Sequence, residues 1–177
     1  WLGGTVADGF DATANFDTVD IPGDIAVHLD TARTIGNLIF GDVDGATTPG
    51  SWLLDDNGNA ANILTLQATG TPTITVNALG AGASATIQAE IAGSNGLNKA
   101  GVGTLTLTGA NSYTGGTTLS GGILAFSALN NLGSGGITFD GGTLQWAGAN
   151  TTDISTRTIT IGPGGGTLDL LANNVTL

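Results

Sequence analysis

Four versions of one unit, a glycine turn followed by a short strand, recur in the second half of this 177-residue chain. They begin at residues 102, 121, 141 and 165 and read VGTLTL, GGILAF, GGTLQW and GGTLDL. A spacing of about 20 residues is typical of a solenoid in which each period builds one coil. The repeats therefore predict a stack of short β-coils whose function is carried by an elongated surface.

Within these units, apolar residues alternate with Thr, Gln and Asp, as expected for strands with one face in a core. Equivalent positions in successive units carry equivalent residues, for example Leu105, Leu124 and Leu144. Parallel stacking would place Leu on Leu and Thr on Thr, with a backbone partner above and below each strand. The pattern predicts an all-β parallel β-helix (β-solenoid) with about 20-residue coils, and about seven or eight coils if those of the first half are longer. Because Asp140-Gly141 is also a hairpin signal, an antiparallel sandwich is the alternative.

The repeats divide the chain into two parts. Residues 1–34 are rich in Asp and poor in repeats, and we expect an irregular N-terminal cap or junction segment there. Residues 35–177 are expected to form the β-helix repeats, with the strongest repeat at 96–126. Because the chain starts without Met and stops in strand-like sequence at 174–177, the sequence indicates a segment of something longer.

Composition excludes several classes of function. The chain has 40% hydrophobic residues, 10% charged residues and a net charge of −11, from 14 acids against three bases. Such a chain folds but lacks the clustered Lys and Arg that bind phosphate backbones, so nucleic acid is excluded as a partner. The absence of Cys excludes disulfides and thiolate metal sites. No apolar run approaches the roughly 20 residues of a membrane span.

The strongest repeat carries an ordered motif. Residues 96–119 read GLNKAGVGTLTLTGANSYTGGTTL, and a Gly-Gly-x-Leu strand follows. This passage closely resembles the autotransporter-associated β-strand repeat, also called the passenger-associated transport repeat. The resemblance implies a right-handed parallel β-helix in the exported passenger of a large bacterial surface or secreted protein. It implies an extracellular or outer-surface location and no particular reaction.

Three acidic loops offer the oxygen ligands that Ca²⁺ prefers. They are Asp8 with Asp11, Asp42-Val43-Asp44-Gly45, and Asp55-Asp56-Asn57-Gly58-Asn59. Their spacing matches neither an EF-hand loop nor the Gly-Gly-x-Gly-x-Asp repeat. We favour the alternative that these side chains cap turns and keep an apolar rod soluble. No metal-ligating residue and no cofactor are therefore assigned.

Catalytic groups are scarce. A glycosidase would need two carboxylates facing each other across a groove, and the single Glu90 and the Asp residues could only supply raw material. Arg33, Lys99 and Arg157 are the only bases, and Lys99 lies in the repeat itself, which favours a structural role with a carboxylate or a backbone carbonyl as its partner. His28 is expected at an exposed strand position. No catalytic residue is assigned, and the chain is predicted not to be an enzyme.

The aromatic residues Trp1, Trp52, Tyr113 and Trp146 could form a sugar-stacking surface if they faced outward. Trp146 alternates in phase with Leu144, which favours a place in the core, whereas Trp52 cannot be placed. The preferred prediction is a structural module of an extracellular bacterial protein that assembles end to end with copies of itself into a fibre or matrix. The alternatives are an adhesin that binds polysaccharide or a cell surface, and a carbohydrate-active β-helix enzyme.

Overall fold

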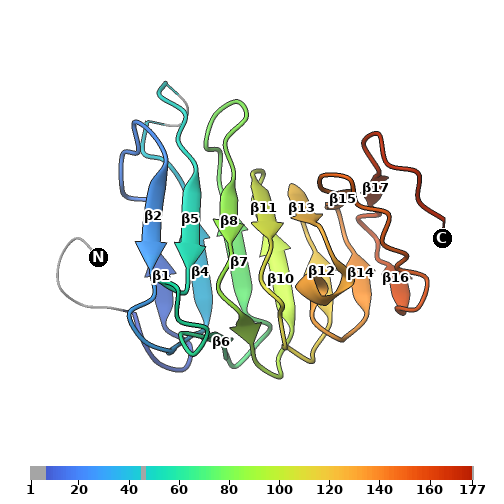
Figure 1. The fold of residues 1–177 in the computed structure, drawn as a ribbon, viewed down its shortest axis with the longest axis horizontal. Helices are drawn as coiled ribbons and strands as arrows, with labels where there is room; N and C mark the ends of the chain where they lie inside the picture. The colour runs from blue at the N-terminus through green and yellow to red at the C-terminus, as the bar shows by residue number, and fades with distance from the viewer. Residues whose placement is uncertain (1–6, 45–46, 177) are drawn as a thin grey trace.

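The fold is an elongated stack of parallel β-coils, seen from the side in Figure 1. The computed structural model describes residues 7–44 and 47–176. Two seven-stranded sheets run along the whole stack, and a three-stranded sheet adds a third side at its N-terminal end. Every strand pair in these sheets is parallel, which confirms the parallel β-helix and excludes the antiparallel sandwich.

Each coil contributes one strand to each of the two long sheets, and the first three coils also contribute one to the third sheet. The first sheet contains β1 (Thr13–Asn15), β4 (Asn37–Phe40), β7 (Thr73–Val76), β10 (Leu97–Ala100), β12 (Thr117–Leu119), β14 (Ile137–Phe139) and β16 (Ile159–Ile161). The second sheet contains β2 (Ile25–His28), β5 (Trp52–Asp55), β8 (Ala85–Ile87), β11 (Thr104–Leu107), β13 (Ile123–Phe126), β15 (Thr143–Trp146) and β17 (Thr167–Asp169). The third contains β3 (Arg33–Ile35), β6 (Leu64–Leu66) and β9 (Ile91–Ala92). The described residues therefore form seven coils, the first three with three strands and the last four with two.

The register follows the sequence repeat in the second half. Leu105 pairs with Leu124, and Leu124 pairs with Leu144, so these coils have the predicted length of about 20 residues. The early coils are longer, because Leu38 pairs with Ile74 in the next coil. The longer coils hold the third strand and the loops around residues 41–51 and 56–62.

Apolar side chains fill the interior in columns, one residue per coil. Leu105, Leu124 and Leu144 are each fully buried, which is the consequence of their alternation with outward Thr and Gln. The Phe126 and Trp146 rings, also in register, meet edge to face with centroids 5.0 Å apart. One continuous core runs through the stack.

Buried asparagines close the corner that follows the second sheet. Asn111 donates from Nδ2 to the carbonyl of Asn131 in the next coil, and Asn131 donates back to the carbonyl of Gly109 at 2.9 Å. Asn150 donates to the carbonyl of Phe126, again at 2.9 Å. These amides satisfy backbone groups that the irregular corner would otherwise leave unpaired.

Helical structure is minimal. The described residues contain one 3₁₀ turn, η1 (Leu129–Leu132), and no α-helix. None of their helical segments is long and apolar enough to cross a bilayer.

Candidate functional site

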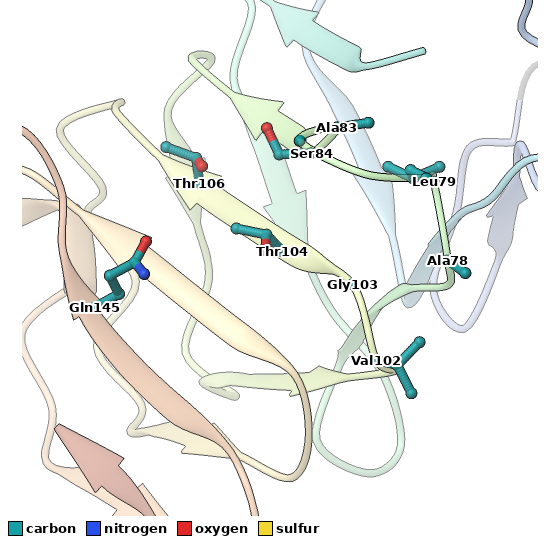
Figure 2. Close-up of a pocket in the computed structure, with 11 residues that line it drawn as sticks. Ala78, Leu79, Ala83, Ser84, Val102, Gly103, Thr104, Thr106 and Gln145 are labelled. Carbon is teal, nitrogen blue, oxygen red and sulfur yellow. The ribbon is translucent and has the colours of Figure 1, made fainter. Parts of the chain in front are cut away.

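A groove with a volume of about 560 Å³ runs along the outer face of the second sheet. It is lined by small, apolar and uncharged polar residues of β11 and β15 and of the loops before β8 and β11: Ala78, Leu79, Gly80, Gly82, Ala83, Ser84, Val102, Gly103, Thr104, Thr106 and Gln145. Figure 2 shows the hydroxyls of Ser84 and Thr106 and the amide of Gln145 along this face. These groups can form neutral hydrogen bonds, and the lining contains no acid, base or aromatic ring.

Three of the aromatic candidates for sugar stacking are buried. Trp146 lies in the core, as predicted, and its Nε1 donates to the carbonyl of Thr152 at 2.8 Å. Trp52 is also buried and donates from Nε1 to the carbonyl of Gly41 at 3.0 Å. Tyr113 is enclosed as well, and this burial raises its pKa to about 12. None of these three rings can therefore form an outward-facing sugar-stacking surface. Trp1 lies outside the described residues.

Lys99 is structural, as its place in the repeat predicted. Its side chain is fully buried. Nζ donates to the carbonyl oxygens of Ala100 at 2.8 Å, Gly101 at 3.2 Å and Gly121 at 3.1 Å. Burial lowers the pKa of the amine to about 8.

The two arginines are also engaged within the fold. Arg33 forms ion pairs with Asp30 at 2.6 Å and with Asp8 at 3.4 Å. Arg157 donates from Nη1 to the carbonyl of Gly135 at 2.7 Å, and from Nη2 to the carbonyl of Gly133. All three basic residues of the chain therefore have partners inside it.

His28 is exposed on the outer face of β2, as expected for its place in the alternation. Its Nδ1 lies 2.7 Å from Oδ1 of Asp55 in the next coil. Burial by itself raises the pKa of Asp55, but hydrogen bonds from His28 and from the N–H of Asn57 outweigh it and hold that pKa below its usual value. The pair joins the first two coils across the surface of the second sheet.

Two of the acidic loops hold the chain's own backbone. Asp11 accepts hydrogen bonds from the N–H and the hydroxyl of Thr69, which lower the pKa of its carboxyl. Asp8 accepts from the N–H of Thr34 in addition to Arg33. Asp56 accepts from the N–H of Gly58, two residues later. The Asp56 contact is that of a turn-forming carboxylate, whereas Asp8 and Asp11 bind backbone groups that are distant in the sequence.

The remaining acidic loop, which carries Asp42 and Asp44, is different, because the fold brings next to it a carboxylate that the sequence did not single out. Asp42 and Asp44 lie together with Asp20, and one oxygen of each is within 4.8 Å of the others. Asp20 lies in the coil before, 22 positions earlier in the chain. The sequence could have indicated this neighbour only through a regular coil length, and the coil length is irregular in this part of the chain.

The C-terminal end of the stack exposes residues that belong to the core by position. Ile159 pairs with buried Ile137, and Leu168 pairs with buried Leu144, yet both are exposed. Ile161, beside them, is 64% exposed. They surround a small hollow floored by Phe139, at the end drawn in red in Figure 1. In the first coil, by contrast, the inward-facing Ala14 is buried.

Known proteins share the repeat. Residues 97–126 and 121–145 match the model of the passenger-associated transport repeat. The chain is also 44% identical over 91 residues to the adhesin BmaC autotransporter of Brucella suis biovar 1 (strain 1330). That alignment covers 50% of this chain and 2% of the relative, so the chain spans a small part of the relative's length. No solved structure matches.

Proposed function

Because the chain carries passenger-associated transport repeats, we propose that it is a structural, non-catalytic segment of an extracellular bacterial surface passenger. Its coils stack end to end with those of another copy and extend a fibre or matrix. The resemblance to part of an autotransporter adhesin supports the surface location. The engagement of Arg33, Lys99 and Arg157 within the fold supports a non-catalytic role.

The residue-for-residue parallel pairing of successive coils is the observation that carries this proposal. Ile159 pairs with Ile137 and Leu168 with Leu144, so these residues and Ile161 continue the apolar columns of the core, and a further coil can stack on them in the same way. Edge strands also offer unpaired N–H and C=O groups, which template further pairing. A contact between this end and the opposite end of a second copy is head to tail, so it propagates as a filament.

The N-terminal part of the chain has a separate role in this proposal. We propose that residues 1–34, whose strands β1 and β2 belong to the first coil, serve as the cap or junction of the stack, and that residues 35–177 form its repeating body. Burial of the inward-facing Ala14 and Phe16 supports a covered N-terminal end. In an end-to-end contact, the N-terminal end of one copy would then pack against the apolar hollow around Ile161 of the next copy.

Assembly is tested by sedimentation velocity and negative-stain electron microscopy of the purified chain over a range of concentrations. The proposal predicts concentration-dependent filaments of uniform width. Ile161→Asp should abolish them by placing a charge in the contact, whereas Val102→Asp should not. Val102 is a matched control because it is 76% exposed on the side of the stack. Monomers at every concentration, or equal loss in both variants, would refute end-to-end assembly.

A second candidate function is binding of a neutral glycan in the lateral groove. The hydroxyls of Ser84, Thr104 and Thr106 and the volume of about 560 Å³ favour it, as does the similarity to an adhesin. Glycan arrays probed with the chain and with Thr106→Arg test it directly. A hit that Thr106→Arg removes would support this candidate, and incubation with acidic and neutral polysaccharides would reveal any cleavage.

A further inference from the structure

The cluster of Asp20, Asp42 and Asp44 has the features of a cation site. Asp20 lies in the loop between β1 and β2, and the other two lie in the equivalent loop of the next coil, between β4 and β5. One carboxylate oxygen from each lies within 4.8 Å of the other two. Thr48 donates to Oδ2 of Asp44 at 3.3 Å, which orients that side chain.

Asp42 supplies a second, independent observation. Its side chain is only 7% exposed. Oδ1 accepts a long hydrogen bond of 3.3 Å from the N–H of Ile21 in the neighbouring coil. Oδ2 is fully buried and has no hydrogen-bond partner among the described residues. A buried carboxylate oxygen with nothing to balance it is costly, and such groups are normally paired or coordinate a metal.

The chain has no basic side chain to spare for this charge. Arg33 pairs with Asp8 and Asp30, and the carbonyl oxygens around Lys99 and Arg157 lie in later coils. The carboxylate of Asp17 adds further negative charge nearby, because it packs against the Cα of Gly41, next to Asp42. A cation that balances this charge would therefore come from solution.

We propose that Asp20, Asp42 and Asp44 bind a Ca²⁺ ion, with Oδ2 of Asp42 as the innermost ligand. The donor set contains only carboxylate oxygens, which suit hard cations and not Zn²⁺, for which nitrogen and sulfur ligands are usual. Ca²⁺ completes an irregular shell with carbonyls and water, whereas Mg²⁺ demands a near-ideal octahedron. The ion joins the first two coils at one corner. This site is independent of end-to-end assembly.

Trp52 provides an intrinsic reporter of the site. Its indole Nε1 donates to the carbonyl of Gly41, the residue before Asp42. A Tb³⁺ ion bound in place of Ca²⁺ would therefore lie close to an excitable indole. Luminescence of Tb³⁺ on excitation of tryptophan measures occupancy, and added Ca²⁺ or Mg²⁺ measures competition.

The experiment titrates the complete chain with Tb³⁺, then with Ca²⁺ and Mg²⁺, and records thermal unfolding with and without Ca²⁺. The wild-type chain should give sensitised luminescence that Ca²⁺ displaces better than Mg²⁺, and Ca²⁺ should raise its Tm. Asp42→Asn should weaken the affinity for Ca²⁺ by about tenfold or more, since a direct ligand contributes at least as much as a residue that only supports a ligand. Asp44→Asn should act in the same direction.

The matched control is Asp56→Asn, which removes the same charge from the neighbouring acidic loop and should leave the titrations unchanged. Without Ca²⁺, Asp42→Asn should have a Tm at least equal to that of the wild type, because it removes an unbalanced buried charge. This outcome also shows that the variant folds. Equal Ca²⁺ responses of the wild type, Asp42→Asn and Asp56→Asn, or no Ca²⁺ response in the wild type, would overturn the proposal.

Discussion

The ammonium group of Lys99, in the fourth coil, donates a hydrogen bond of 3.1 Å to the carbonyl oxygen of Gly121, in the fifth. Two further bonds reach carbonyl oxygens of its own coil, those of Ala100 and Gly101. Lys99 is thus an internal tie between two coils, held by backbone dipoles and not by a carboxylate. A point charge with several donors suits such a corner because it satisfies several carbonyls at once.

Lys99 should make the protein more stable as the solution becomes alkaline. Burial lowers its folded-state pKa from 10.5 to about 8, so between these values the unfolded chain binds more protons than the folded chain. The free energy of unfolding therefore rises with pH over this window, by at most about 3 kcal/mol. Urea titrations from pH 7.5 to 10 measure it. Lys99 is the only lysine of the chain, so Lys99→Met should flatten the rise, and an unchanged slope would contradict the assignment.

Tyr113 should produce the opposite trend at higher pH. Burial raises its folded-state pKa from 10.0 to about 12, so the unfolded chain loses this proton first. The free energy of unfolding should then fall as the pH rises above 10. Tyr113 is the only tyrosine, so Tyr113→Phe should remove the fall. Absorbance of the phenolate near 295 nm, followed during the same titration, checks that ionisation and unfolding coincide.

Gly122 should tolerate no side chain. Its φ is +60°, and a Cβ there would lie 2.5 Å from the carbonyl oxygens of both Gly101 and Gly103. Gly148 is a matched control, with a φ of +64° and nothing within 4 Å of a Cβ. Gly148→Ala should cost about 1 kcal/mol of unfolding free energy from the backbone conformation alone. Gly122→Ala should cost about 1–3 kcal/mol more from overlap, measured by urea denaturation. Equal losses would show that the corner yields easily.

Asn131 should be the costliest of the corner asparagines to remove. Its Oδ1 accepts from the N–H of Ser127 at 3.0 Å and of Ala128 at 2.8 Å, while Nδ2 donates to two carbonyls of the preceding coil. Asn131→Ala leaves buried groups unpaired and should lower the unfolding free energy by about 3 kcal/mol. Asn98→Ala, which loses surface contacts to Thr73 and Ser120, should cost less than about 1 kcal/mol. Similar losses in both would contradict the role of the corner column.

The later coils were predictable from sequence because equal residues stack on equal residues. Leu105, Leu124 and Leu144 fix the register of the second sheet without any structure. The structural role of Lys99 was also predictable, since a single cation inside a repeat has little else to do. Its partners, three backbone carbonyls, depend on how the corner turns and are visible only in the fold.

The early coils were harder, because their length varies and their paired residues differ. The third sheet uses strands of two or three residues, such as Ile91–Ala92, which are too short for a periodic signal. The same irregularity hid the neighbourhood of Asp20 and Asp42, since pairing across coils of unequal length cannot be read from spacing. Burial of Trp52 was likewise invisible, because it depends on the Gly41 carbonyl of the preceding loop.

The loss of the third sheet after β9 has a mechanical consequence. Ladder hydrogen bonds in a β-helix run along its axis, so an axial pull loads them directly, one coil after another. The first three coils share that load over three strand pairings, whereas the last four share it over two. A rod built in this way should yield first among the coils that follow β9, while the three broader coils before them remain intact.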